Sequence, residues 1–397
     1  MSKPPFISIL GSTGSVGQNT LEVLKQNSAY SVYALSAHQN VELLLEQCKQ
    51  HNPVYAVVTD AASVEKFSRL LSNAECQTEL LTAADALQRI ASAAEVDAVM
   101  AAIVGGAGLA STLAAVAAGK RVLLANKESL VMSGDLFMAS ALNSGATIIP
   151  IDSEHNAVFQ CLPLNARGLD SSQMTDVDKI VLTASGGPFL DTPVEQLNRI
   201  TPEQACNHPK WDMGQKISVD SATMMNKGLE FIEASYLFGV GAAQIEVLIH
   251  PQSIVHSMVY YRDGSVLAQL ANPDMRIPIA YGLAYPQRMP SGAPTLNLAE
   301  IGVLEFRTPD LERFPCLALG IEAAKQGGTV PTLLNAANEE AVAAFLNGAI
   351  SFTQIPLINE AVMSKIPCEA ALSLAIIQDA DEQARSLSKE LILKDFH

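Results

Sequence analysis

The sequence is poor in cations. Lys and Arg together number 25 against 41 Asp and Glu, so the formal net charge is −16 at pH 7. Nucleic-acid backbones require a basic face, and this balance therefore argues against a nucleic-acid partner. An anionic small molecule is not excluded, because a few local cations and backbone N–H groups are enough to bind one phosphate.

Cysteine pairs and long apolar runs are also missing. None of the six cysteines is in a CxxC spacing, so free buried thiols are expected rather than disulfides or a zinc site. No apolar run approaches the roughly 20 residues of a membrane span, so no membrane partner is expected. A strand-like segment follows the first few residues with no signal-peptide pattern, which favours a cytoplasmic protein. The cysteines are Cys48, Cys76, Cys161, Cys206, Cys316 and Cys368.

Short apolar runs alternate with helical patterns over the first 151 residues. This alternation predicts a Rossmann-like, doubly wound parallel sheet, and therefore an α/β class for this domain. The expected helices include residues 41–50 and an Ala-rich segment before residue 122. The expected strands are residues 6–10, 31–37, 55–59, 96–102, 122–125 and 146–151.

The rest of the chain has a different pattern. Residues 152–285 mix strand-like and helical segments and include an Asp263-Gly264 turn, so we expect a central α+β domain with a partly antiparallel sheet. Residues 286–311 begin with several prolines and read as a linker. Residues 312–397 carry helical patterns and are expected to form a C-terminal helical bundle. Its expected helices are residues 317–325, 332–346, 355–363 and 381–393.

A glycine-rich turn follows the first expected strand. Gly11, Gly14 and Gly17 let the backbone turn tightly beside a pyrophosphate, and the next helix offers its N-terminal N–H groups. A turn of this kind without a ligand is the plainer interpretation, but the strand and helix around it favour a dinucleotide. The end of the second strand, residues 37–40, carries no acid for a ribose 2′-OH. It offers hydrogen-bond donors instead, which favours NADP over NAD.

Two carboxylates stand where this nucleotide-binding pattern ends. Asp152 and Glu154 are two residues apart, and in an extended segment such residues point to the same face. Carboxylate oxygens select hard ions such as Mg²⁺, Mn²⁺ or Ca²⁺. An isolated D-x-E is more often a solvated loop, but Glu230 supplies a third acid. Residues 219–238 are expected to form one helix. Asn226, Lys227 and Glu230 fall on one arc of it amid apolar neighbours, and such a polar cluster needs partners or a ligand.

Lys127 follows the buried strand 122–125, at the edge of a parallel sheet where ligands bind. It is a candidate to stabilise oxyanion charge, although a surface lysine at a helix start fits equally well. The segment 185–215 is rich in Gly, Pro and polar residues and is a candidate mobile loop. Its single tryptophan, Trp211, could close over a substrate or pack beneath the loop. Ser185 opens a possible phosphate nest, for which a plain turn is the alternative.

Together these segments closely resemble the 1-deoxy-D-xylulose 5-phosphate reductoisomerase family. The likeness runs nearly end to end and includes residues 334–339 near the C-terminus. The segments that carry it are Gly11–Gly17 (GSTGSVG), 124–130 (LANKESL), 152–156 (DSEHN), 185–188 (SGGP), 216–230 (KISVDSATMMNKGLE) and 250–253 (HPQS).

The resemblance implies an NADP-dependent oxidoreductase of isoprenoid precursor synthesis. It would use NADPH and Mg²⁺, Mn²⁺ or Co²⁺ as a homodimer, and would isomerise and reduce 1-deoxy-D-xylulose 5-phosphate to 2-C-methyl-D-erythritol 4-phosphate. Many members carry a basic residue after the second strand, where this chain has His38 and Gln39.

The resemblance also implies roles for individual residues. Asp152, Glu154 and Glu230 would bind the metal, and Lys127, Glu154, His208 and Glu230 would be catalytic. The implied substrate-binding residues are Ser153, Ser185, His208, Trp211, Ser221, Asn226 and Lys227. The implied cofactor-binding residues are Gly11, Thr13, Gly14, Ser15, Val16, Ala37, His38, Gln39, Asn40, Asn126, Glu128 and Met213.

Two other functions fit parts of the pattern. A dehydrogenase of the semialdehyde kind would use a nucleophilic cysteine and no metal, but no cysteine stands in an evident activating motif. A non-catalytic nucleotide-sensing protein would bind NADPH and have no use for three carboxylates. His155 and His256 fit structural histidines in either case.

Overall fold

The structure is a computed structural model of the 397-residue chain. It describes residues 4–27, 30–74, 76–163, 174–207, 211 and 214–394. The chain divides into two compact units. The first comprises residues 1–129, 139–156 and 274–294; the second comprises residues 130–138, 157–273 and 295–397.

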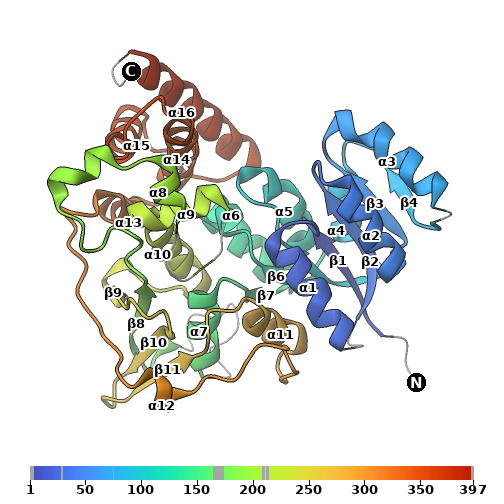
Figure 1. The fold of residues 1–397 in the computed structure, drawn as a ribbon, viewed down its shortest axis with the longest axis horizontal. Coiled ribbons are helices and arrows are strands. Elements are labelled where there is room, and N and C mark those ends of the chain that lie inside the picture. Colours follow the sequence, from blue (N-terminus) through green and yellow to red (C-terminus); the bar gives the residue numbers. More distant parts are fainter. Residues whose placement is uncertain are drawn as a thin grey trace. The chain divides into compact units, whose positions relative to one another are not determined.

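The first unit is built on a parallel sheet of seven strands in the order β4-β3-β2-β1-β5-β6-β7 (Figure 1). Its central strands are mostly apolar and largely buried, as expected for strands covered on both faces. The order reverses between β1 and β5, which creates a switch point where ligands commonly bind. The strands are β1 (Phe6–Leu10), β2 (Ser31–Ala37), β3 (Tyr55–Val58), β4 (Glu79–Leu81), β5 (Val96–Ala101), β6 (Arg121–Leu124) and β7 (Thr147–Pro150).

Helices connect and cover these strands. The predicted doubly wound sheet is confirmed, and the only addition within the described residues is the three-residue edge strand β4. The helices are α1 (Ser15–Gln26), α2 (Val41–His51), α3 (Ala61–Asn73), α4 (Ala86–Ser92), α5 (Leu109–Ala117), α6 (Lys127–Ser144), the start of α7 (Ser153–Cys161) and α11 (Arg276–Ala284); η1 (Gly106–Gly108) is a 3₁₀ turn.

Helix α11 comes from far along the chain and completes this first unit. A methyl group at Gly282 would lie 2.8 Å from Ile151 and 3.1 Å from Leu123, so α11 rests directly on β6 and the residue after β7. Asn27, after α1, donates a hydrogen bond of 2.9 Å to the carbonyl of Pro290. Residues 274–294 are therefore part of the first unit, and α11 contributes to its core.

The second unit contains a mixed four-stranded sheet in the order β11-β10-β8-β9. β8 (Val177–Ala184) pairs parallel with β9 (Ile245–Ile249) and antiparallel with β10 (Val255–Tyr261). β10 continues into β11 (Val266–Leu270) through the predicted Asp263-Gly264 turn, in which Gly264 has φ +88°. The partly antiparallel sheet is thus confirmed.

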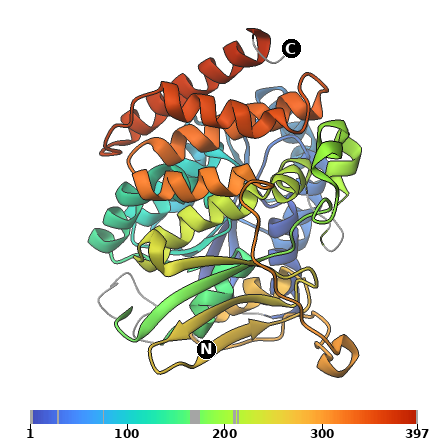
Figure 2. The ribbon, with the colours of Figure 1, turned by 90° about the vertical axis from the view of Figure 1, so that its left-hand side faces the viewer.

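The larger helices of the second unit, within residues 225–238 and 315–394, lie on one side of this sheet in Figure 2. α10 (Met225–Phe238) packs against α13 so closely that a methyl group at Gly320 would lie 2.3 Å from Gly228 Cα. The four C-terminal helices predicted from the sequence are confirmed; three are two or three residues longer than expected, and the last begins seven residues earlier. They are α13 (Pro315–Gln326), α14 (Val330–Leu346), α15 (Gln354–Lys365) and α16 (Leu374–Lys394).

Smaller elements lie between these parts. The segment 185–215 contains η4 (Val194–Arg199) and α8 (Pro202–Cys206), and Thr201 and Gln204 form a capping box on α8. α9 (Gln215–Thr223) precedes α10, and η5 (Ala242–Gln244) and α12 (Leu298–Ile301) follow it along the chain. Among the described residues, no helix is both long enough and apolar enough to span a bilayer.

Candidate active site

The glycine loop after β1 needs glycine at two of its three positions. Gly11 has φ +83°, and a methyl group there would lie 2.7 Å from the carbonyl oxygen of Ala102, which follows β5. At Gly17 a methyl group would lie 2.4 Å from the carbonyl oxygen of Gly11. The loop therefore folds back on the start of α1 beside the β1/β5 switch point. A dinucleotide pyrophosphate fits this arrangement of turn and helix N-terminus.

The loop is also fixed from the side of β2 and α2. Ser12 Oγ donates to Gln47 Oε1 at 2.7 Å, and Gln47 Nε2 donates to the Ser12 carbonyl at 2.8 Å. These buried bonds hold the loop backbone in one conformation. Thr13, Ser15 and Val16 occupy its partly or fully exposed part and the start of α1, where a ligand could reach their backbone groups.

The expected 2′-phosphate position follows β2. Ala37 ends the strand, and the three exposed residues after it lead into α2. His38 Nδ1 is hydrogen-bonded to Thr59 Oγ1 at 2.9 Å, and Asn40 accepts a bond from Leu43 N–H as the cap of α2. His38 and Asn40 thus have structural partners, and Gln39 is exposed between them.

Lys127 and Asp152 form an ion pair in the first unit. Lys127 begins α6, after β6, and its side chain is 9% exposed; Asp152 follows β7 and is 17% exposed. Asn126 caps α6 by accepting from Ser129 N–H at 3.0 Å, and Glu128 is buried in the first turn. The predicted position of Lys127 at the carboxyl edge of the sheet is confirmed.

The conformation expected around Asp152 and Glu154 is wrong. The two residues are not in an extended segment, because α7 begins at Ser153 and Glu154 lies in its first turn. An acid in that position is favoured by the helix dipole. The carboxylates nevertheless converge, since ligand oxygens of Asp152 and Glu154 lie within 4.8 Å of each other. Ser153 Oγ donates to Glu154 and helps to orient that carboxylate.

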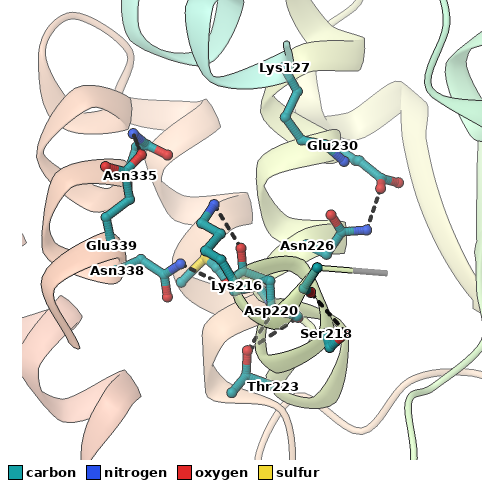
Figure 3. A network of polar contacts seen from close by, with 12 residues as sticks. Lys127, Lys216, Ser218, Asp220, Thr223, Asn226, Glu230, Asn335, Asn338 and Glu339 are labelled. Atoms are coloured by element: carbon teal, nitrogen blue, oxygen red, sulfur yellow. Dashed lines mark hydrogen bonds and ion pairs between the residues drawn. The ribbon is translucent and has the colours of Figure 1, made fainter. Parts of the chain in front are cut away.

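Glu230 lies on α10 in the second unit. Asn226 Nδ2 and Lys227 Nζ both donate to its carboxylate, as Figure 3 shows for Asn226. Lys227 and Glu230 are 3% and 1% exposed. The predicted grouping of Asn226, Lys227 and Glu230 on one helix face is therefore confirmed. One turn further on, Glu233 is a fully buried acid that the sequence analysis missed, although its E-x-x-E spacing from Glu230 is readable.

Ser221 is not on the same helix as this cluster. α9 ends at Thr223 and α10 begins at Met225, with Met224 left-handed at φ +59° between them. The single expected helix is thus two. Ser221 meets the Ser185 turn instead: a methyl group at Gly187 would lie 2.7 Å from the Ser221 carbonyl, and Gly187 N–H donates to Ser185 Oγ at 3.1 Å.

The loop residues are described only in part. The Trp211 ring lies edge-on to the His256 ring, with centroids 6.2 Å apart. Trp211 is half-buried, and His256 is buried in β10. His208 and Met213 lie outside the described residues.

Burial disfavours the reactive thiolate form of three of the cysteines. Burial raises the pKa of both Cys48 and Cys316 to about 12, and it raises the pKa of Cys206 as well. A nucleophilic cysteine needs the opposite shift. A glycine loop at a sheet switch point, with one buried lysine–carboxylate pair in each unit, defines the class of this protein as a dinucleotide-dependent oxidoreductase.

Comparisons with known proteins agree along the whole chain. The family model of 1-deoxy-D-xylulose 5-phosphate reductoisomerase matches residues 7–134, and the models of its two C-terminal domains match residues 148–238 and 270–387. The reductoisomerase of Cellvibrio japonicus is 55% identical and covers 99% of this chain and 100% of its own. That of Pseudomonas aeruginosa is 54% identical with 99% of both chains covered.

Solved structures lead to the same family. A reductoisomerase in complex with NADPH, fosmidomycin and magnesium has a TM-score of 0.94 at 45% identity, covering 99% of this chain and 100% of its own. The Zymomonas mobilis enzyme in complex with NADPH has a TM-score of 0.91 at 44% identity, with 99% and 100% covered. The chain belongs to the 1-deoxy-D-xylulose 5-phosphate reductoisomerase family. It is an oxidoreductase that isomerises and reduces 1-deoxy-D-xylulose 5-phosphate to 2-C-methyl-D-erythritol 4-phosphate in isoprenoid precursor synthesis.

Proposed function

We propose that Asp152, Glu154 and Glu230 hold one divalent metal ion during this reaction. The chemistry of the donors supports it, since all three offer the hard carboxylate oxygens that Mg²⁺ prefers. The convergence of Asp152 and Glu154 within 4.8 Å is the observation that carries the proposal. A solved relative contains magnesium with NADPH. Mn²⁺ and Co²⁺ would suit the same ligands.

We propose that Ser185, Ser221, Asn226 and Lys227 bind the phosphate of the substrate. The contact of Gly187 with the Ser221 backbone supports this, because it brings two hydroxyl-bearing segments together. Gly186 and Gly187 both have positive φ, at +82° and +69°, a backbone form that turns N–H groups toward an anion. Lys227 would supply the compensating charge.

NADPH is proposed to bind along the glycine loop of Gly11, Thr13, Gly14, Ser15 and Val16. Further contacts would come from the end of β2 and the start of α6. Without an arginine among residues 37–40, selectivity for the 2′-phosphate would depend on neutral or weakly basic donors. The remaining proposed cofactor contacts are Ala37, His38, Gln39, Asn40, Asn126, Glu128 and Met213.

When bound, the metal ion would polarise the substrate carbonyl and its neighbouring hydroxyl, and NADPH would supply the hydride. Lys127 would stabilise negative charge on substrate oxygens while its ion pair orients Asp152. Ser153 and His208 would contact those oxygens. Trp211, held against His256, would exclude water above the substrate. Phosphate binding is remote from the reacting carbons, so its binding energy would serve orientation.

The assignment is tested by replacing Glu154 with Gln and measuring loss of NADPH absorbance with 1-deoxy-D-xylulose 5-phosphate at increasing Mg²⁺. Glu246→Gln is the matched control, since Glu246 pairs with Lys179 on the sheet of the second unit. We expect Glu154→Gln to need more Mg²⁺ for half-maximal activity and Glu246→Gln to match the parent. Equal Mg²⁺ dependence in all three proteins would remove Glu154 from the metal site.

We further propose that the protein is a cytoplasmic homodimer, as the resemblance to its family implies. The division into residues 1–151, 152–285, 286–311 and 312–397 likewise stands as a proposal for its functional regions. Sedimentation equilibrium of the purified chain measures the oligomeric state directly. A mass near 42.1 kDa at micromolar concentration would contradict the dimer.

A further inference from the structure

The α9–α10 junction fixes the spacing of three proposed phosphate ligands. Ser221 lies in the last turn of α9, and Asn226 and Lys227 lie in the first turn of α10. Only Met224 separates the two helices. Whatever sets the direction of α9 therefore also sets where the Ser221 hydroxyl stands relative to Lys227.

Thr223 ties the two helices together at this junction. Its Oγ1 donates to the Asp220 carbonyl at 3.2 Å and accepts from Met225 N–H at 3.3 Å. One hydroxyl therefore bridges the end of α9 and the start of α10. The junction is held by hydrogen bonds across the break as well as by the chain itself.

Asp220 anchors α9 in the interior of the second unit. Its side chain is 2% exposed and lies between Lys216 Nζ at 2.8 Å and Asn338 Nδ2 at 2.7 Å (Figure 3). Asn338 on α14 in turn accepts from Asn359 on α15 at 3.2 Å, and both amides are fully buried. A line of polar contacts thus runs from α9 through α14 to α15.

A buried charge is a costly way to join helices, because apolar side chains of similar size do so without desolvation. This charge also stands next to Ser221, where a substrate phosphate is proposed to bind. A lone carboxylate would repel that phosphate, but the positive charge of Lys216 offsets the negative charge of Asp220. The Lys216 side chain is 24% exposed. The arrangement combines a rigid anchor with local neutrality beside an anion site.

We propose that Asp220, held between Lys216 and Asn338, is a positioning residue for phosphate binding by Ser221. The inference rests on the proposed phosphate site. Asp220 does not contact the substrate; it fixes α9 in the direction that presents the Ser221 hydroxyl beside Asn226 and Lys227. Its loss therefore weakens phosphate binding and leaves the chemical step intact in the folded enzyme.

The test uses the full-length enzyme with NADPH and Mg²⁺ and measures KM and kcat for 1-deoxy-D-xylulose 5-phosphate, with inhibition by inorganic phosphate. Asp220→Asn keeps the size of the side chain and removes its charge. KM and the phosphate inhibition constant are each expected to rise about tenfold, the usual effect of losing a hydrogen bond to a charged group. kcat is expected to stay within about twofold.

Three further variants make the result specific. Asp220→Asn combined with Asn338→Asp exchanges the two partners and is expected to restore KM. Lys216→Gln tests the same anchor from its partly exposed end, should the buried variants fold poorly. Arg385→Gln is the matched control, because Arg385 joins α16 to α14 through Glu339 at 2.7 Å and is expected to change neither constant.

The outcomes separate the inference from the site on which it rests. Lys227→Gln is expected to raise KM and the phosphate inhibition constant together. If Lys227→Gln raises both constants but neither Asp220→Asn nor Lys216→Gln does, the positioning role of Asp220 is wrong and the proposed phosphate site stands. If Lys227→Gln leaves the phosphate inhibition constant unchanged, the phosphate assignment falls and the inference with it. A loss of kcat in Asp220→Asn at unchanged KM would show a structural role only.

Discussion

Lys127 and Asp152 form a mostly buried ion pair that joins the start of α6 to the second residue after β7. Both stand at the carboxyl edge of one parallel sheet, just beyond the ends of the neighbouring strands β6 and β7. A buried pair of this kind is costly to break, because the remaining charge is left without its partner. Because of this pairing, Lys127 holds the carboxylate of Asp152, a proposed metal ligand, in a fixed orientation.

The first prediction concerns this pair. Lys127→Gln removes the cation that orients Asp152 and that is proposed to stabilise substrate oxygens. We expect kcat to fall by about 100-fold or more, as for loss of one donor to a developing oxyanion. Steady-state rates at saturating Mg²⁺ and NADPH are the measurement. Lys179→Gln breaks a surface pair with Glu246 and is the control. A parent-like kcat would contradict the role of Lys127.

Glu230→Gln is the second prediction. The amide keeps the shape of the side chain and removes the charge proposed to bind the metal. Turnover should fall strongly, while NADPH binding, followed by its fluorescence, stays nearly intact because the glycine loop is untouched. Glu246→Gln again serves as the control. Unchanged turnover at saturating Mg²⁺ would show that Glu230 is not a metal ligand.

The third prediction concerns the glycine loop. A methyl group at Gly17 would lie 2.4 Å from the Gly11 carbonyl and 2.5 Å from Ser12 Cα. Gly17→Ala should therefore displace the loop, raise KM for NADPH and lower the free energy of unfolding by about 1–3 kcal/mol. Gly241→Ala is the control, because nothing lies within 4 Å of a methyl group there. Equal NADPH constants in both variants would count against the loop as the cofactor site.

The fourth prediction concerns pH. His250 is fully buried, with Nδ1 bonded to the Glu305 carbonyl at 2.8 Å and Nε2 accepting from Ile254 N–H at 3.1 Å. Burial lowers the pKa of His250 below its ordinary value of 6.5. The unfolded chain therefore takes up the proton first as pH falls, so His250 stabilises the fold above about pH 6.5 and progressively less below it.

Urea unfolding at pH 8 and pH 5.5 measures this effect. As the pH is lowered, the free energy of unfolding should decrease less steeply in His250→Gln than in the parent, because one titrating group is gone. The comparison of slopes is independent of any constant loss of stability that the substitution causes. An equal change in the free energy of unfolding between pH 8 and pH 5.5 in the two proteins would show that His250 does not contribute to the pH dependence of stability.

Much of the fold follows from local sequence. β1 and β2 coincide with their mainly apolar runs because strands buried on both faces carry few polar side chains. β4 was missed because it has three residues and only Leu81 is buried. The break at Met224 was missed because a left-handed methionine has no sequence signature, unlike the glycines at most positive-φ positions.

The site was predictable where spacing along one element decides it. Asn226, Lys227 and Glu230 share a face because they lie within about one turn of α10. The sequence predicted an extended segment around Asp152 and Glu154, and this was wrong. The structure has a helix that starts at Ser153, and this helix brings the two carboxylates together equally well. The bond between Asp220 and Asn338 could not be read from the sequence, because it depends on how α9 packs against α14.

Helix α11 has a consequence for the order in which the protein can be assembled. The sheet of the first unit is complete in sequence by Pro150, but its covering helix is synthesised more than a hundred residues later. A nascent chain that ends before residue 276 exposes the apolar surface of Leu123, Ile149 and Ile151 where Gly282 comes to rest. About half of the second unit is therefore synthesised before the first unit can close its core.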